Sequence, residues 1–298
     1  MDKVIIQYIE KRRRDYDNPT WATLADEINR QFQTLYNKES LRSWYRRQNT
    51  ITPLPKPFND ILEIPHITTL VVSDFHSPFH NPAMLDLAIK SAAHHNVKQI
   101  VVAGDLFDFN VISSHPKNDA TTRIQSDLHI GGEILLALAE YAPVYVTNGN
   151  HDERVAKKLD INLPLASVIH MALAGKTPRH KIEVTEYDYL YIGKSYIAGH
   201  LSNYSKEPGK IAVELANKYN RHVLVGHDHI RGVKLSDNGL LFGISIGGML
   251  MKDRFWYKER RLTVLPEFEN GFAVVHETGE VSVYGDNERY TTYGIAQA

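Results

Sequence analysis

Five short clusters of carboxylate, amide and imidazole side chains are the part of this sequence best suited to chemistry. They are Asp74-Phe75-His76, Gly104-Asp105-Leu106-Phe107-Asp108, Gly149-Asn150-His151-Asp152, Gly199-His200 and Gly226-His227-Asp228-His229. Each cluster is short enough to occur by chance, but together they form an ordered set of donors. Oxygen and imidazole donors without thiolates are typical ligands of hard to borderline divalent metals. The 298 residues include no cysteine, which excludes thiolate zinc sites, disulfides and a cysteine nucleophile.

Divalent metals held by such donors can catalyse hydrolysis, and phosphate esters are one class of substrate for which they do so. Two divalent ions about 3.5–4 Å apart lower the pKa of water and neutralise the charge that develops on a phosphate under attack. A histidine just beyond the metal ligands can donate the proton that a leaving group needs. A carboxylate on the other ring nitrogen can orient that histidine. This chemistry requires no serine or cysteine nucleophile.

The clusters follow segments that we expect to be strands. The hydrophobic pattern predicts strands at 68–73, 99–103, 144–148, 189–192, 195–198 and 223–225, and helices at 82–95, 121–141, 153–159 and 210–219. Asn238-Gly239 and Thr278-Gly279 predict two hairpins nearer the C-terminus. The alternation indicates an α/β core, in which ligands lie beyond the carboxyl ends of the strands. The five clusters are expected at those ends.

The ordered clusters resemble the calcineurin-like metallophosphoesterase superfamily, whose pattern runs D-x-H, G-D-x-x-D, G-N-H-[DE], a lone His, and G-H-x-H. The resemblance covers residues 67–276 and implies an α/β fold, a two-sheet α/β/β/α sandwich with a two-metal site. It implies a role for each matching residue: Asp74, His76 and His229 on one metal, Asn150, His200 and His227 on the other, Asp105 bridging both, His151 as the catalytic histidine and Asp108 as the carboxylate that orients it.

Two departures from the superfamily pattern indicate which branch of the superfamily this sequence resembles. Protein serine/threonine phosphatases extend the second cluster to G-D-x-x-D-R-G and the third to G-N-H-E, whereas this sequence has Asp108-Phe109-Asn110 and Asn150-His151-Asp152. The second and third clusters of this sequence resemble those of the branch that contains DNA repair nucleases and nucleotide phosphodiesterases. The resemblance implies two divalent metal ions, with manganese expected and iron or zinc as alternatives.

A separate basic module is expected at residues 1–47, followed by a proline-rich linker at 48–64 and the metallophosphoesterase domain at 65–298. Residues 1–56 carry 11 Lys and Arg against 7 Asp and Glu, a charge of +4, which leaves −5 for the remainder. The apolar spacing predicts three short helices. The first spans 3–14, the second begins after an N-cap at Asn18 with Pro19 as its first residue, and the third spans 39–47. This small all-α module resembles a helix-turn-helix domain.

The arginines of the module are the candidate contacts to nucleic acid: Arg12, Arg13, Arg14, Arg42, Arg46 and Arg47. Basic residues near helix C-termini also complement the helix dipole, so solvated helix ends are the alternative interpretation. Trp44 and Tyr45 can stack on bases, although one of them is expected in the core of the module. A second basic and aromatic run at 252–261 fits a nucleic-acid groove and a sheet edge equally well.

These features predict a metal-dependent phosphodiesterase acting on nucleic acid, most specifically a DNA nuclease. Two alternatives stay open: a phosphatase or cyclic-nucleotide phosphodiesterase with a docking module, and a DNA-binding regulator with a vestigial metal domain. The complete donor set argues against the vestigial form. No apolar run approaches the roughly 18 residues that cross a bilayer, and no secretory segment opens the sequence, so we expect a cytoplasmic protein without a membrane partner. The sequence does not define the oligomeric state.

Overall fold

The computed structural model divides the chain into two compact units, residues 1–60 and 61–298. It describes residues 3–14, 19–49, 61–113, 123–255, 267–285 and 291–293. Most of the expected linker and residues 256–261 of the second basic run lie outside the described residues.

The first unit is helical, as expected. Its helices are α1 (Lys3–Arg14), α2 (Trp21–Phe32) and α3 (Lys38–Asn49). Their apolar faces form a small core of Ile5, Ile9, Leu24, Ala25, Ile28 and Leu41. The expected N-cap of α2 was wrong, because the Thr20 side chain accepts the Thr23 backbone N–H and Pro19 precedes the helix. A threonine hydroxyl accepts a hydrogen bond from an unpaired N–H group at the start of a helix, as an asparagine side chain would.

The second unit alternates strands and helices before it turns to hairpins. Its strands are β1 (Glu63–Ile64), β2 (Thr69–Val72), β3 (Gln99–Ala103), β4 (Val144–Thr147), β5 (Ile182–Val184), β6 (Tyr189–Ile192), β7 (Tyr196–His200), β8 (His222–Gly226), β9 (Arg231–Leu235), β10 (Phe242–Ile246), β11 (Gly271–Val275), β12 (Val281–Gly285) and β13 (Thr291–Tyr293). Its helices are α4 (Pro82–His94), α5 (Ile124–Tyr141), α6 (Arg154–Leu159), α7 (Leu165–Leu173), α8 (Lys210–Tyr219) and the 3-10 turns η1 (Asn110–Ile112) and η2 (Lys252–Arg254).

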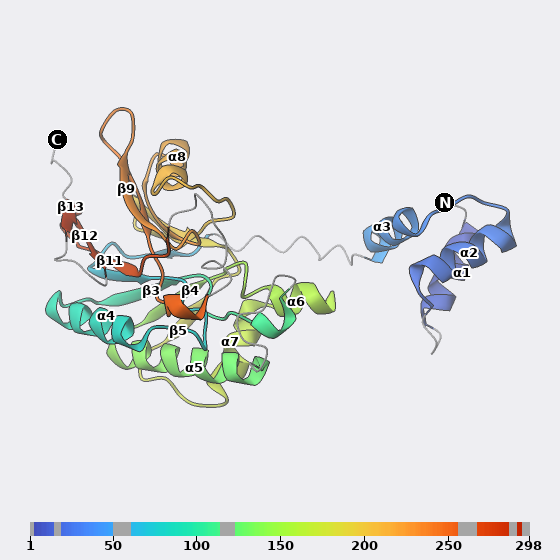
Figure 1. Ribbon diagram of the computed structural model, residues 1–298, viewed down its shortest axis with the longest axis horizontal. Coiled ribbons are helices and arrows are strands. Elements are labelled where there is room, and N and C mark those ends of the chain that lie inside the picture. The colour runs from blue at the N-terminus through green and yellow to red at the C-terminus, as the bar shows by residue number, and fades with distance from the viewer. Residues whose placement is uncertain are drawn as a thin grey trace. The chain divides into compact units, whose positions relative to one another are not determined.

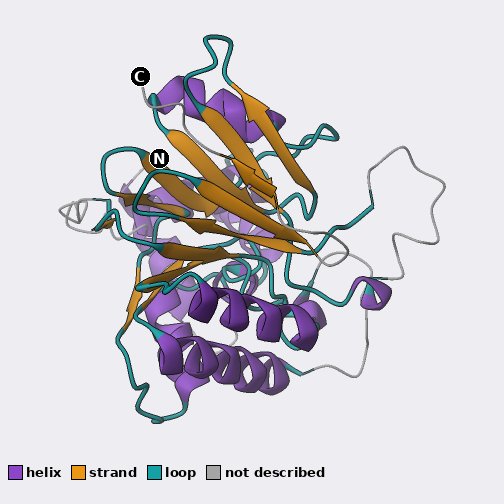
Figure 2. Cartoon of the chain, turned by 90° about the vertical axis from the view of Figure 1, so that its left-hand side faces the viewer, coloured by secondary structure: helices purple, strands orange, loops and turns teal. Residues whose placement is uncertain are grey.

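The strands form two stacked sheets, which confirms the predicted α/β/β/α architecture. One sheet has the order β1-β6-β7-β8-β10-β9, and the other has β13-β12-β11-β2-β3-β4-β5. Strands β2, β3 and β4 are parallel to one another, as are β7 and β8. Helix α8 covers the outer face of the first sheet, whereas α4 and α5 cover the second (Figure 1). Figure 2 shows the two sheets between these helical layers.

The central strands are buried on both faces, which explains why they appear in the sequence as short apolar runs. In β2, Leu70 and Val72 belong to the core beneath the helices, while Val71 belongs to the core between the sheets. Strand β3 alternates in the same way, with Val102 toward the helices and Val101 toward the other sheet. This double burial fixes the strand ends, and therefore the loops that follow them. Within the described residues, no helix is long and apolar enough to cross a membrane.

Candidate metal centre

The predicted donors lie at or just beyond the carboxyl ends of parallel strands from both sheets. The strands and their donors are β2 with Asp74 and His76, β3 with Asp105, β4 with Asn150, β7 with His200, and β8 with His227 and His229. Parallel strands end at the same edge of a sheet, and the two sheets face each other. Residues separated by more than 150 positions are therefore brought to one place.

The backbone at these donors is unusual. The φ angles are 55° at Asp74, 47° at His76, 49° at Asp105, 96° at His227 and 53° at His229. Residues other than glycine rarely adopt positive φ, and each such residue costs about 1–3 kcal/mol. The surrounding structure holds five donors in this conformation, a pattern typical of functional sites.

Glycines in the motifs permit the loops to approach closely. A Cβ atom on Gly226 would lie 1.9 Å from the Ser73 hydroxyl oxygen and 2.2 Å from a carboxylate oxygen of Asp74. A Cβ atom on Gly149 would lie 2.1 Å from the Asp105 backbone nitrogen. Both positions therefore require glycine, because any side chain would push the donor loops apart.

The first group of donors is Asp74, His76 and His229, whose ligand atoms lie within 4.8 Å of one another. The Nε2 atom of His229 is 3.0 Å from Asp74 Oδ1 and 2.9 Å from His76 Nε2. Two ring nitrogens that face each other at this distance need a proton or a cation between them. The geometry therefore fits a positive charge at the centre of the group.

The second group surrounds His200. Its Nε2 atom lies 3.1 Å from Asn150 Oδ1, 3.2 Å from His227 Nδ1 and 3.3 Å from Asp105 Oδ2. The same Asp105 oxygen is 3.7 Å from Nε2 of His76 in the first group. Asp105 thus lies between the two groups, where the resemblance implies a bridging carboxylate.

The electrostatics of the cluster favour bound cations. Burial by itself would raise the pKa of Asp74, yet His229 and His76 hold that pKa well below its usual value. Burial would lower the pKa of His76, but its contacts with Asp108 and Asp74 raise the pKa to about 10. Asp105 likewise raises the pKa of His200 to about 9 against the effect of burial. The carboxylates stay ionised and attract positive charge, so the donor set fits two divalent metal ions.

His151 lies beside the donors and is oriented by Asp108. Its Nδ1 atom is 2.9 Å from Asp108 Oδ1, and its Nε2 atom is 3.8 Å from Asp105 Oδ2. The same Asp108 oxygen lies 3.0 Å from Nδ1 of His76. Burial lowers the pKa of His151 to about 4. The free ring is therefore neutral at neutral pH, and we place its proton on Nδ1, toward Asp108.

Two residues of this region were given no role from the sequence. Arg154 donates through Nη2 to His151 Nε2 at 2.7 Å, and through Nη1 to the Asp108 carbonyl at 2.6 Å. Its position two residues after the third cluster was the available signal. Asp152 accepts the backbone N–H groups of Phe107 and Gly149, both at 3.0 Å, and so ties the second cluster to the third.

The arginines of the N-terminal unit do not share one role. Arg12 donates through Nε and Nη2 to the Glu27 carboxylate, each at 3.0 Å, which ties α1 to α2. Arg12 therefore has a structural partner in Glu27, and its contact with phosphate stays a prediction. Arg42 is exposed on α3. The side chains of the remaining candidates lie outside the described residues: Arg13, Arg14, Arg46 and Arg47.

Both aromatic candidates of α3 pack within the unit. Trp44 and Tyr45 are partly buried against its core, and the Tyr45 ring lies 5.1 Å from that of Trp21. The expectation that one of them is available to stack on bases is not supported by this packing. This packing holds α3 against the core of the unit.

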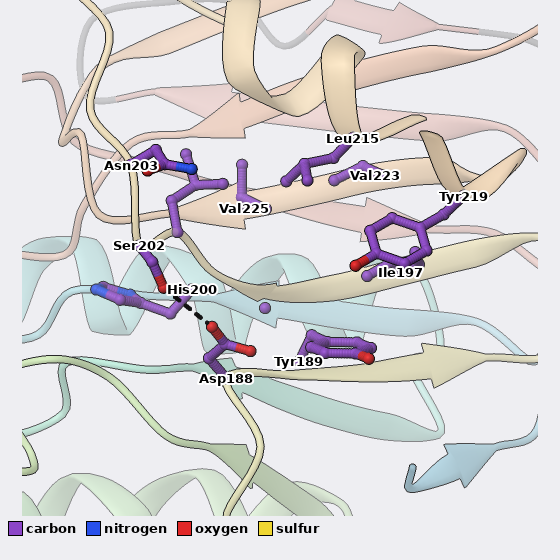
Figure 3. Close-up of a pocket in the computed structure, with 12 residues that line it drawn as sticks. Asp188, Tyr189, Ile197, His200, Ser202, Asn203, Leu215, Tyr219, Val223 and Val225 are labelled. Atoms are coloured by element: carbon purple, nitrogen blue, oxygen red, sulfur yellow. Dashed lines mark hydrogen bonds between the residues drawn. The ribbon is translucent and has the colours of Figure 1, made fainter. Parts of the chain in front are cut away.

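A cavity of about 140 Å³ lies between α8 and strands β6 to β8. Tyr189, Leu215 and Tyr219 line its apolar part, and Asp188 and Ser202 lie at a polar end (Figure 3). His200 borders the cavity, but its ring points away from Leu215 and Tyr219 (Figure 3). The cavity is therefore next to the donor cluster without containing it.

Comparison with known proteins gives one family and a set of solved structures with low sequence identity. The family model of the calcineurin-like phosphoesterases matches residues 67–231. Among solved structures, an archaeal phosphodiesterase has 15% identity, coverage of 74% of this chain and 100% of its own, and a TM-score of 0.41. A single mutant of Vps29 from Entamoeba histolytica has 12% identity, coverage of 76% and 97%, and a TM-score of 0.40. A dimetal phosphatase from Danio rerio has 12% identity, coverage of 78% and 100%, and a TM-score of 0.43. No curated protein matches the sequence.

Proposed function

This chain belongs to the calcineurin-like phosphoesterase family, and we propose that the bonds it hydrolyses are the phosphodiesters of nucleic acid, DNA in particular. The family and the donor groups make it a metal-dependent phosphoesterase. One observation carries the finer proposal: the complete donor set is joined in one chain to a separate compact unit with a basic charge balance.

The two donor groups would hold the two metals, with Asp105 Oδ2 shared between them. When bound, the metals lower the pKa of water and offset the charge that develops on a phosphate under attack. We propose manganese, because carboxylate, amide and imidazole donors without thiolate suit it. Iron and zinc are the alternatives that metal analysis distinguishes.

His151 supplies the proton in this proposal. Its ring is neutral before substrate binds, because burial lowers its pKa to about 4. This modifies the expectation for His151, since the ring must gain a proton before it can act as an acid. A phosphate anion next to Nε2 favours the charged ring and so raises the pKa. His151 then takes up a proton together with the substrate and donates it from Nε2 to the leaving oxygen. Asp108 retains the Nδ1 proton and keeps the ring in that orientation.

The helical unit is proposed to bind the nucleic-acid backbone. Lys11 and Arg42 are exposed on α1 and α3, and the two arginine runs of the sequence fall at the ends of the same helices. Phosphate contacts of this kind supply affinity without sequence preference. They also concentrate a polymer, rather than a small ester, near the catalytic unit.

The test of this function is turnover by the full chain with manganese on four substrates. They are single-stranded DNA, double-stranded DNA, a cyclic nucleotide and a phosphorylated peptide. The proposal predicts efficient DNA cleavage and much slower reaction with the other two. Preference for the cyclic nucleotide or the phosphopeptide would instead assign the chain to the alternative small-substrate class.

A further inference from the structure

We propose that Arg154 is a substrate contact that binds a non-bridging oxygen of the phosphate undergoing hydrolysis. The inference rests on the proposed two-metal site and on His151 as proton donor. It does not depend on DNA as the substrate, since any phosphodiester presents the same oxygens. Arg154 was absent from the residues that the sequence identified.

The first argument is position. Arg154 Nη2 lies 2.7 Å from Nε2 of His151, and that nitrogen lies 3.8 Å from Asp105 Oδ2. Asp105 Oδ2 is the oxygen between the two donor groups. A phosphate that reaches both the donor groups and His151 must occupy the space beside these atoms. The guanidinium is therefore already within contact distance of that space.

The second argument concerns the present partner of Nη2. A ring nitrogen has one in-plane direction for a hydrogen bond, so Nε2 cannot serve a leaving oxygen and Arg154 together. When substrate takes Nε2, the Nη2 group must turn to another acceptor. A phosphate oxygen is the acceptor that arrives at the same moment, and charge-assisted bonds from guanidinium to phosphate are strong and directional.

The third argument is that the rest of the side chain is anchored. Nη1 donates to the Asp108 carbonyl at 2.6 Å and lies 3.6 Å from Asp108 Oδ1. The Arg154 backbone N–H donates to the His151 carbonyl at 2.9 Å. The side chain remains 19% exposed, so part of it can be reached from solvent. The residue is held in the site with one donor directed at the reacting region.

A purely positioning role is the competing explanation, in which Arg154 acts only by holding the His151 ring. The two explanations differ in a double-mutant cycle. A positioning residue loses its effect once His151 is removed, whereas a direct phosphate contact keeps it. Inhibition by inorganic phosphate also separates them, because phosphate binding requires no proton donor.

The experiment compares Arg154→Ala, Arg154→Lys and the control Lys158→Ala, an exposed cation on the same helix α6. Metal content and thermal unfolding are measured first, and hydrolysis of a chromogenic phosphodiester follows. We expect Arg154→Ala to lower kcat/KM by about 10–100-fold and to weaken inhibition by inorganic phosphate, with partial recovery in Arg154→Lys. Added guanidinium should restore part of the activity of Arg154→Ala, and Lys158→Ala should behave like the parent chain.

The decisive comparison is made in the His151→Ala background. The proposal predicts that Arg154→Ala still lowers kcat/KM there by a similar factor. It is overturned if the second substitution has no further effect, or if phosphate inhibits Arg154→Ala and the parent equally. If Arg154→Ala loses its metal or does not fold, the same comparison is made with Arg154→Lys. Failure to cleave DNA would count against the proposed substrate and leave this test on the chromogenic diester intact.

Discussion

The Asp108 carboxylate oxygen Oδ1 lies 2.9 Å from Nδ1 of His151, and it holds the ring that we propose as the proton donor. The same oxygen lies 3.0 Å from Nδ1 of His76, a member of the first donor group. One carboxylate thus couples the orientation of the proton donor to that of a metal ligand. Hydrogen bonds to the outer nitrogen of a ligating histidine fix its tautomer and strengthen it as a ligand.

Replacing His151 by alanine should separate proton donation from metal binding. We expect both metals to remain, because neither the Asp74 group nor the Asp105 group includes His151, which clusters instead with His76 and Asp108. Turnover should fall by about 10²–10⁴-fold. The loss should be smaller on a nitrophenyl ester, whose leaving group needs no proton. Steady-state rates on nitrophenyl and alkyl diesters test this. An equal loss on both would indicate that His151 acts by positioning or charge.

Asp108→Asn should do more than weaken His151. The amide cannot accept from both rings with the strength of a carboxylate, so His76 loses part of its support as well. We expect lower turnover together with weaker metal binding, the latter by about 10–100-fold. Metal titration followed by rates at saturating metal distinguishes the two effects. Unchanged metal affinity would mean that the contact with His76 has no role in holding the metal.

The sequence predicted the donor set because each donor follows a short strand that is buried on both faces. Such strands appear as apolar runs, and the glycines and polar residues after them mark the loops. Strand β5 was missed, since Ile182–Val184 is an edge strand with Glu183 at its centre and only partial burial. Strand β1, with two residues, is below the length at which a pattern is visible.

Contacts between distant side chains could not be predicted in the same way. The pairing of Arg12 with Glu27 depends on how α1 packs on α2, and nothing in the local sequence distinguishes Arg12 from Arg13. The return of Arg154 onto His151 depends on the turn between them. Spacing identified the residue types at the site, whereas the partner of each charged group required the tertiary structure.

The stability of the chain should fall as the pH falls below neutrality. His222 is buried, its Nδ1 accepts the Phe242 N–H at 3.2 Å, and burial lowers its pKa to about 4. An unfolded histidine has a pKa of about 6.5, so between pH 6.5 and 4 the unfolded chain binds the proton more readily. The free energy of unfolding therefore decreases as the pH decreases through this range.

The variant His222→Asn tests that relation. Its amide oxygen, bonded to Cγ like Nδ1 of His222, can accept the Phe242 N–H but does not titrate, so the stability of the variant should depend less on pH. Urea unfolding of parent and variant at several pH values from 7 to 4, in chelator, gives both slopes. Identical slopes would show that His222 does not contribute to the acid sensitivity.

Removal of the helical unit should separate DNA binding from chemistry. A chain that starts at residue 58 retains the second unit with its cores and donors, so hydrolysis of a small chromogenic diester should survive. DNA affinity should fall, and the log–log salt slope should decrease by about 0.9 per lost phosphate contact on duplex DNA or about 0.7 on a single strand. Unchanged affinity and slope would contradict the nucleic-acid role.

Two full-length variants refine this comparison. Neutralising Arg42, Arg46 and Arg47 together should reproduce part of the loss of DNA affinity without loss of fold. Arg12→Ala should mainly destabilise the unit, because it breaks the ion pair with Glu27. If truncation instead changes the mass in solution and leaves DNA binding intact, the unit is a docking module.

The most direct test of the whole account is a titration of the metal-free chain with manganese, monitored by cleavage of a DNA strand. The account predicts no cleavage without metal and saturation at about two ions per chain. It also predicts that Asp105→Ala disturbs both sites and abolishes cleavage, because Asp105 Oδ2 lies between the donor groups. The exposed Asp237→Asn should titrate like the parent. Cleavage that persists in chelator, or full metal occupancy and activity in Asp105→Ala, would contradict the account.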